Sequence, residues 1–432
     1  MKQLFTFLFT IFILCQGLAQ KKRDSLKSVW LDKSLHDSTR LESMKFLITE
    51  HYLSTKTDSA LILANTMLDY THNKKYIKCE IDFQTIIGEI YFEQSKFDIG
   101  IESYTKGLEL AKTVNDSTIY SKKLFELGIL YYDHEDYVNA FKTLQKSQEA
   151  CKIAGDRLNE GWSVGYLGLL FKDLGDYKKA EKYHLEHLRL STKYGIKRSI
   201  SGANGNLGAV YDAMGNISKS IKHWKEAIKL AKELDLDAYA SIGTLNLISI
   251  YIKEKQFSNA QKYLDEYIEV TKDFDAPLYG QNIKIFQCQI ENGFGNYTTA
   301  LQKCESCLKL LETLTNEYVE KKLYESLYQI NKKLNRQNEA LDYFEKYQIL
   351  IDNEKEDKAR TEIQNLVFNN QIVTDSIAQA QEKELLNATF RASLDKKNQE
   401  QNLFIIIGLT VLLLAVVYFQ VSKKIAATER KR

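Results

Sequence analysis

Proline is almost missing from this chain of 432 residues, in which Pro277 is the only one. Strands and the turns between them usually bring more prolines, so this lack favours a helical fold. An excess of one charge is missing too, because 59 basic and 57 acidic residues leave a net charge of +2. Nucleic-acid binding normally needs clustered excess Lys and Arg, and we therefore expect no nucleic-acid partner.

Motifs that carry catalysis are also missing. No Gly-rich phosphate loop follows a predicted strand, and no Gly-x-Ser-x-Gly nucleophile occurs. All seven histidines precede the apolar segment near the C-terminus, so no phospho-accepting histidine follows it. We expect no catalytic domain, no metal site and no cofactor in this sequence.

What the chain does contain is a repeat of 40 residues. Small residues recur at this spacing at Ala60, Gly100, Ala140, Ala180, Ser220, Ala260, Ala300 and Ala340. Twelve residues before each lies a second series: Ile48, Gly88, Gly128, Gly168, Gly208, Ile248, Cys288 and Tyr328. Four residues after the small one comes a mostly large residue: Tyr104, Leu144, His184, Trp224, Leu264, Cys304 or Phe344. Closely packed antiparallel helices require small residues on one helix to face large residues on the other. Each repeat therefore predicts a helical hairpin.

The turn inside each hairpin also has a signal. Gly175, Gly215 and Gly295 are each followed by Asp or Asn, and such residues tolerate the left-handed conformation that ends a helix. The second helix is predicted to open on the residue three before the small one, which is usually aromatic.

The order Leu-Gly-x-x-Tyr, small residue, large residue resembles the tetratricopeptide repeat, in a 40-residue version. The resemblance covers about eight units and is strongest in repeats two to six. It implies an all-α solenoid over residues 41–350, preceded by a cap helix over 20–40, that offers a curved surface to a peptide or protein.

Both ends carry membrane signals. Lys2, the apolar run over 4–14 and the small residues Gly17 and Ala19 predict a secretory signal peptide over 1–19. The uncharged stretch from Leu403 to Phe419 predicts a membrane-spanning helix over 402–421. The tail over 422–432 is basic, and the positive-inside rule assigns it to the cytoplasm and the bulk of the chain to the other side.

Between array and span, residues 351–401 predict a helical stalk. The first part is densely charged, and Ile363, Leu366, Val373, Ile377 and Ala380 keep a heptad-like spacing interrupted by a polar residue, Asn370. The heptads then break. This pattern is open to two interpretations, a parallel dimeric coiled coil or a helix packed on the last repeat.

The order of signal peptide, array, stalk, span and basic tail resembles the receptor half of bacterial membrane signalling proteins. In those proteins the cytoplasmic output is a class III adenylate or guanylate cyclase, a histidine kinase or a DNA-binding domain. The resemblance implies a single-pass protein of the bacterial inner membrane with a periplasmic array. The sequence ends 12 residues after Gln420, and we expect no output domain in it. Three hypotheses remain: a receptor region, a truncated cyclase or kinase, and a membrane-tethered scaffold.

Glycines in the first helices of repeats four and five suggest a ligand groove. Interior helical glycine costs about 1 kcal/mol relative to alanine, so a gain elsewhere is expected. The candidate groove residues are Trp162, Gly165, Lys172, Gly202, Asn204, Gly205, Asn206, Asp212 and Asn246. The alternative is that the glycines only permit tight helix packing. Gly165 and Leu169 stand where a peptide-carboxylate clamp would need polar residues, so such a clamp is not expected there.

Histidines and cysteines complete the candidates. His184 and His187, with His223 one repeat later, have a spacing that suits a metal site, but the first two fall on core positions of repeat four. We expect packed, hydrogen-bonded core histidines. Cys304 and Cys307 occupy the same two positions in repeat seven. Together with Cys79, Cys151 and Cys288, they are predicted to be buried free thiols.

Overall fold

The fold is an all-helical array, seen in a computed structural model that describes residues 22–429 apart from 54, 115, 273–276 and 313. The predicted signal peptide lies outside these residues. Within the described part, no strand is present. A helix over 22–31 precedes the array, where the cap helix was expected.

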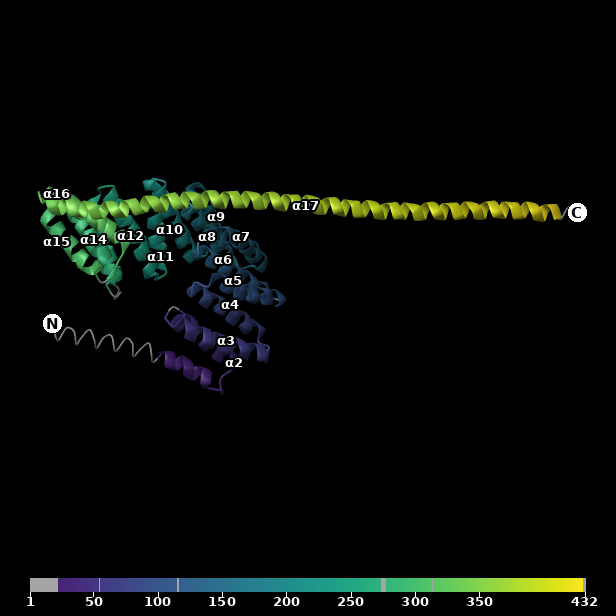
Figure 1. Cartoon of the computed structure of the whole chain (residues 1–432), viewed down its shortest axis with the longest axis horizontal. Helices are drawn as coiled ribbons and strands as arrows, with labels where there is room; N and C mark the ends of the chain where they lie inside the picture. Colours follow the sequence, from purple (N-terminus) through teal and green to yellow (C-terminus); the bar gives the residue numbers. More distant parts are fainter. Residues whose placement is uncertain (1–21, 54, 115, 273–276, 313, 430–432) are drawn as a thin grey trace. The chain divides into compact units, whose positions relative to one another are not determined.

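The array consists of successive helical hairpins (Figure 1). Its helices are α2 (Asp37–Leu47) with a π-helical turn η1 (Ile48–Tyr52), α3 (Thr57–Lys74), α4 (Ile77–Glu93), α5 (Phe97–Thr113), α6 (Ser117–Asp133), α7 (Tyr137–Ala154), α8 (Arg157–Asp173), α9 (Tyr177–Tyr194), α10 (Lys197–Ala213), α11 (Ile217–Glu233), α12 (Asp237–Lys253), α13 (Phe257–Thr271), α14 (Pro277–Phe294), α15 (Tyr297–Leu311), α16 (Glu317–Lys333) and α17 (Gln337–Glu429). From α4 onward, equivalent helices begin 40 residues apart. The predicted solenoid of 40-residue hairpins is therefore confirmed.

The small and large residues of the repeat meet inside the hairpins whose first helix carries the repeat glycine, as predicted. A Cβ atom added to Gly128 would lie 2.8 Å from a methyl carbon of Leu144, and one added to Gly208 would lie 2.8 Å from the Trp224 ring. Only glycine lets these bulky side chains approach the first helix so closely. The repeat glycines therefore set the distance between the two helices of a hairpin.

Hairpin turns share one backbone conformation. The turn residue has a positive φ in every hairpin from α4/α5 to α16/α17: Ser95, Glu135, Gly175, Gly215, Lys255, Gly295 and Asn335. The following residue donates its N–H back to the helix, as Asp176 does to the carbonyl of Phe171 at 2.8 Å. The three glycine turns were predicted. The turns at Ser95, Glu135 and Lys255 were not, because these residue types do not indicate a left-handed conformation.

Helix starts are also explained locally. The side chain of Asp156 accepts a hydrogen bond from the backbone N–H of Asn159 at 3.2 Å, and Asp176 caps α9 in the same way. Pro277 begins α14, where its missing N–H has no helical partner to lose.

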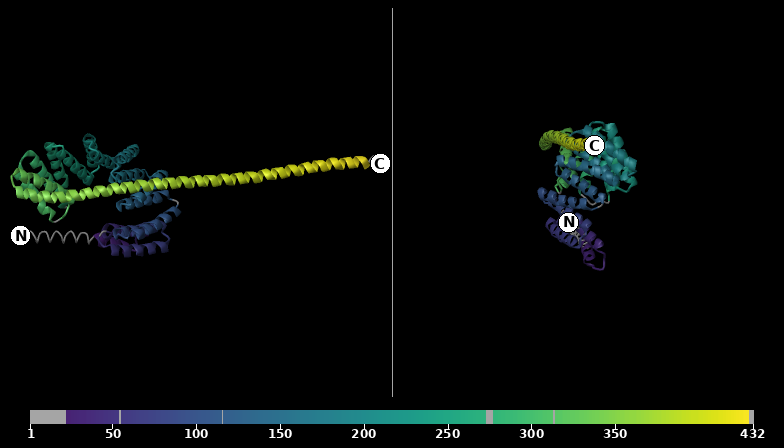
Figure 2. Two further views of the ribbon diagram at one scale, coloured as in Figure 1. Left: turned by 45° about the horizontal axis from the view of Figure 1, so that its top comes forward. Right: turned by 90° about the vertical axis from the view of Figure 1, so that its right-hand side faces the viewer.

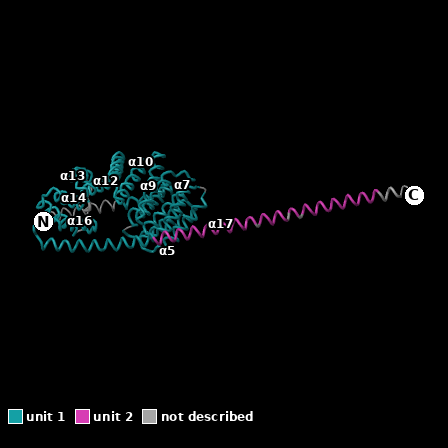
Figure 3. Tube along the Cα trace, turned by 90° about the horizontal axis from the view of Figure 1, so that it is seen from above, with its two compact units in different colours: residues 1–365 teal, residues 366–432 magenta. Residues whose placement is uncertain are grey.

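The last helix, α17, has 93 residues and includes the second helix of the final hairpin, the predicted stalk and the predicted span. Its most apolar 18-residue window has a mean hydropathy of 2.6 and is 0% buried, so by length and composition it could cross a membrane. The chain divides into two compact units after residue 365 (Figure 3).

Candidate functional site

The hairpins stack side by side along the array (Figure 2), and their first helices lie closer together from one hairpin to the next than their second helices do. The first helices contact one another between neighbouring hairpins, as α12 does with α14 and α14 with α16. In a curved stack the inner elements are the closest together, and this side presents a continuous surface to a ligand.

A groove of about 570 Å³ lies on this inner side, in the C-terminal half of the array. Its walls come from α10, α12, α14 and α16, from the turn before α13 and from the first residue of α13, Phe257. The lining residues are Asp212, Ser249, Ile250, Ile252, Lys253, Lys255, Phe257, Gln289, Asn292, Gly293, Tyr318, Lys322, Glu325, Ser326 and Gln329. This volume is in the range of small-ligand sites, and the lining mixes apolar and hydrogen-bonding groups as such sites do.

Lys322 joins the two walls of the groove. From α16 its ammonium donates to the Ser249 hydroxyl on α12 at 3.0 Å, and it also donates to the hydroxyl of Tyr318. The two hydroxyl oxygens lie 3.1 Å apart. These contacts connect hairpins that are separated by a third one, α14/α15, and they depend on the curvature of the stack. Sequence reasoning missed this cluster, since 73 residues separate Lys322 from Ser249.

Only one of the predicted groove residues, Asp212, lines this groove, where it pairs with Lys253 at 3.4 Å. Lys172 pairs with its neighbour Asp173 at 3.1 Å. The Asn246 amide donates to the carbonyl of Ile242 in its own helix at 2.8 Å. Ligand contact by these residues stays a prediction.

The predicted glycines of repeats four and five lie against aromatic rings. A Cβ atom on Gly202 would be 2.7 Å from the Trp162 ring, and one on Gly165 would be 2.7 Å from the ring of His187. Gly205 has more room, with the Trp224 ring at 3.4 Å. These glycines make space for packed side chains, which is the second of the two interpretations offered above.

The predicted asparagines of repeat five differ from one another in burial. Asn204 is buried; its amide donates to the carbonyl of Ile200 and its oxygen lies 2.8 Å from Nδ1 of His223. The His223 ring also stacks on Tyr211, with centroids 5.3 Å apart. Asn206 is half-buried on the same helix.

Histidines 184 and 187 are core residues, as predicted. Both are fully buried, and Nε2 of His187 lies 2.8 Å from the Ser199 hydroxyl. Neither nitrogen of His184 has a hydrogen-bond partner in the described part of the chain, so the expected bonding is confirmed for His187 alone. Burial lowers the pKa of His184 to about 3 and that of His187 to about 4. Among the described residues, no group of three or more His, Cys, Asp or Glu side chains could hold a metal ion.

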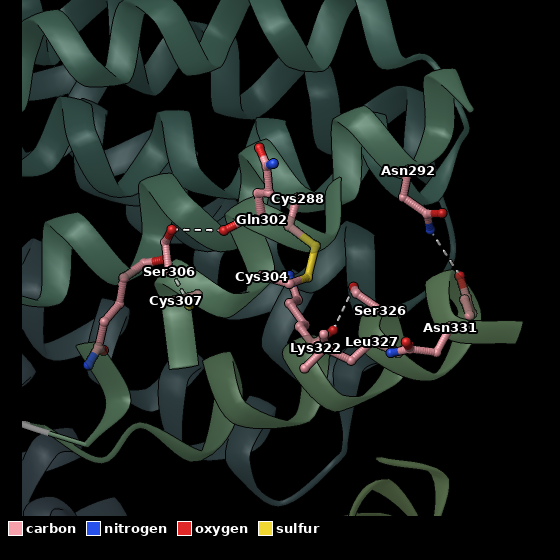
Figure 4. Close-up of a disulfide and its surroundings, with 12 residues drawn as sticks. Cys288, Asn292, Gln302, Cys304, Ser306, Cys307, Lys322, Ser326, Leu327 and Asn331 are labelled. Carbon is pink, nitrogen blue, oxygen red and sulfur yellow. Dashed lines mark hydrogen bonds between the residues drawn. A yellow bond between two sulfur atoms is a disulfide. The ribbon is translucent and has the colours of Figure 1, made fainter. Parts of the chain in front are cut away.

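The prediction of free thiols was wrong for two of the five cysteines. Cys288 on α14 and Cys304 on α15 form a disulfide, with Cα atoms 5.3 Å apart (Figure 4). They stand 16 residues apart at the paired positions of the hairpin, and that spacing would have identified them. Cys307 and Cys151 are buried free thiols as expected, whereas Cys79 is a free thiol as expected but only half-buried, so its predicted burial was wrong. Burial raises the pKa of Cys307 to about 12, which makes its thiol unreactive.

A second polar cluster lies in the N-terminal half of the array. Lys123 is only 8% exposed and pairs with Asp82 at 3.1 Å and Glu126 at 2.9 Å. Lys45 reaches the same Asp82 at 3.3 Å. Burial raises the pKa of the nearby Glu89 to about 7, against the opposing effect of Lys123. These residues are not at equivalent repeat positions, and the periodicity therefore gave no sign of them.

Comparison with known proteins supports the repeat assignment. A tetratricopeptide repeat family model matches residues 118–193. No curated protein matches the chain. Among solved structures, the apo form of RapI is similar with a TM-score of 0.57 and 13% identity, covering 78% of this chain and 99% of that one.

Two further structures have the same arrangement. Aspartyl phosphate phosphatase F from Bacillus subtilis is similar with a TM-score of 0.52 and 14% identity, covering 67% of this chain and 75% of that one. The Rap conjugation gene regulator of plasmid pLS20, in complex with the Phr* peptide, is similar with a TM-score of 0.50 and 15% identity, covering 80% and 97%. At sequence identities this low, the similarity shows a shared fold alone. The family-model match over residues 118–193, together with the 40-residue hairpins described above, shows that the chain is a protein of tetratricopeptide-type repeats.

Proposed function

We propose that this chain is a membrane-anchored receptor whose tetratricopeptide array binds a peptide or an extended protein segment on its inner side. The groove of about 570 Å³ between α10, α12, α14 and α16 carries this proposal. Its width across four hairpins suits an extended chain with several side chains. The structure of the similar pLS20 regulator is of a complex with a peptide, which is consistent with such a ligand.

The same proposal assigns the array to the outside of the cytoplasm. The predicted signal peptide, the apolar segment of α17 and the basic tail after it support this orientation. A disulfide between Cys288 and Cys304 is also consistent with an oxidising compartment, because cytosolic thiols are kept reduced.

Helix α17 is the proposed relay. Inside the first unit it contacts the array at two distant places: Glu354 pairs with Lys321 of α16, and Gln364 donates to Glu135 in the turn of repeat three at 3.3 Å. A ligand that changes the curvature of the array would alter the distance between these two contacts. The change would then pass along a continuous helix toward the membrane.

A second copy of the chain is the proposed partner of the stalk. The heptad-like residues Ile363, Leu366, Val373 and Ile377 are 54 to 66% exposed, and so present an apolar stripe along α17. The polar Asn370 within that stripe would favour a parallel dimer in one register.

Orientation is tested with alkaline phosphatase, which is active only outside the cytoplasm, fused after residue 401 or after Arg432. Activity from the first fusion and none from the second is expected. Activity from the second fusion would contradict the proposed orientation.

Relay is tested by replacing Ile377 with Cys and measuring disulfide crosslinking between copies in membranes. Crosslinking is expected, and a bound peptide should change its yield. The Ser376→Cys variant, on the neighbouring position, is the matched control. An unchanged yield with a peptide of demonstrated binding would favour a scaffold that relays nothing.

A further inference from the structure

The groove contains a positive charge that has no ion-pair partner within the part of the chain described. Lys322 is half-buried, and the groups around its ammonium are the hydroxyls of Ser249 and Tyr318 and the ring faces of Tyr318 and Phe286, whose centroids lie 4.2 and 5.3 Å away. Another cation of the groove differs from it. Lys253 is paired with Asp212. One acidic residue, Glu325, lies one turn along α16 and lines the groove without forming an ion pair with Lys322.

Two hydrogen-bond donors in the cluster around Lys322 have no acceptor among the three side chains. A lysine ammonium has three N–H groups, and the two hydroxyls accept two of them. Ser249 and Tyr318 share one further hydrogen bond between their oxygens, so one of the two O–H groups also stays free. One N–H and one O–H, beside an unpaired positive charge, match the two oxygens of a carboxylate.

A buried acceptor lies in the same groove. Oε1 of Gln289, on α14 between the two walls, has no hydrogen-bond partner within the described residues. An unmet acceptor of this kind is costly, and a ligand N–H would satisfy it. A carboxylate with an amide N–H near it is the chemistry of a peptide end or of an acidic peptide residue.

We propose that Lys322, Ser249 and Tyr318 bind a carboxylate of the peptide that occupies the groove. The side-chain oxygen of Gln289 then accepts a hydrogen bond from one of the peptide's N–H groups. This inference rests on the proposed peptide-binding function and names the part of the peptide that is recognised. The carboxylate is either the C-terminus of the peptide or an Asp or Glu side chain. Both sources present the same two oxygens.

The experiment uses the full chain in detergent and a pool of synthetic random hexapeptides, supplied once with free and once with amidated C-termini. Retained peptides are identified by mass spectrometry for the wild-type protein, for Lys322→Met and for Lys333→Met. Lys333 is exposed on the same helix outside the groove and is the matched control. Circular dichroism melting checks that each variant folds.

Wild-type protein and Lys333→Met are expected to enrich carboxylate-bearing peptides. Lys322→Met should lose this enrichment by about tenfold to a hundredfold, the usual effect of losing one charge-assisted hydrogen bond. Loss of retention on amidation would identify the C-terminus, and enrichment of Asp or Glu in both pools would identify a side chain.

Peptides retained equally by wild type and Lys322→Met, with no preference for carboxylates, would overturn the inference and leave peptide binding intact. If folded wild-type protein retained no peptide from either pool, the proposed function itself would be contradicted.

Discussion

Cys288 and Cys304 occupy in repeat seven the pair of positions that Gly168 and His184 occupy in repeat four. In both hairpins the first member lies on the first helix and the second member lies on the facing turn of the second helix. A glycine packed against a large ring and a pair of bonded cysteines both fit the short distance between the two helices of a hairpin. The array thus tolerates very different residue pairs at this position as long as their combined size fits.

The disulfide is predicted to stabilise the α14/α15 hairpin. Reduction, or the double variant Cys288→Ala/Cys304→Ala, should lower the free energy of unfolding by about 3 kcal/mol, because a crosslink over 16 residues restricts the unfolded chain. Urea unfolding with and without reductant measures this. Reductant should have no effect on the double variant; an equal effect on it would show that the disulfide is not the cause.

Acid is predicted to destabilise repeat four. The folded-state pKa values of His184 and His187 are about 3 and about 4, below the ordinary value of 6.5, so protonation favours the unfolded state. Stability is complete above pH 6.5 and is lost as the pH falls toward the folded-state values. At pH 5 each histidine should remove about 2 kcal/mol.

Replacing His184 with Leu, the residue of the equivalent position Leu144, tests this origin. Urea unfolding from pH 8 to pH 5 should show a loss smaller by about 2 kcal/mol in the variant than in wild type. An unaltered pH profile in His184→Leu would contradict the assignment.

Two glycines of α8 are predicted to respond oppositely to substitution by alanine. A Cβ atom on Gly168 would lie 2.5 Å from the His184 ring, and the overpacking should cost about 1–3 kcal/mol. Gly161 has no neighbour nearer than 3.5 Å, so Gly161→Ala should gain up to about 1 kcal/mol from helix propensity. Thermal unfolding of the two variants gives the comparison, and equal effects of both substitutions would refute the packing argument.

Lys123 is predicted to stabilise the fold through the charge cluster in the N-terminal half of the array. Lys123→Met leaves the carboxylates of Asp82 and Glu126 without their buried partner and should cost about 3 kcal/mol. The neighbouring Lys122 is 60% exposed, and Lys122→Met should change stability by less than about 0.5 kcal/mol. Denaturant unfolding at pH 7 distinguishes the two. Similar small effects would indicate that the buried pairs contribute little.

The periodic part of the fold could be predicted from the sequence. The aromatic expected to open each second helix does so at Phe97, Tyr137, Tyr177, Phe257 and Tyr297. Helix starts, hairpin pairs and small-to-large contacts all depend on residues fewer than 40 positions apart. Such local patterns can be predicted directly from the spacing of residue types along the chain.

The candidate site was predicted only in part. Repeat glycines pointed to α8 and α10, but rings fill the space beside Gly165 and Gly202, and of the predicted residues only Asp212 lines the groove. Glycine in a helix signals a close approach without saying whether a ligand or a side chain makes it. The sequence could not distinguish these two cases.

By itself, the sequence determined a helical array with a 40-residue period and an apolar C-terminal segment, because both follow from local side-chain spacing. Tertiary structure decided the left-handed turn at Glu135, the Cys288–Cys304 disulfide and the meeting of Lys322 with Ser249. That meeting joins residues two hairpins apart, and its existence depends on the curvature of the stack. Curvature is the sum of small rotations between successive hairpins, each set by packing over many side chains, and no single motif encodes it.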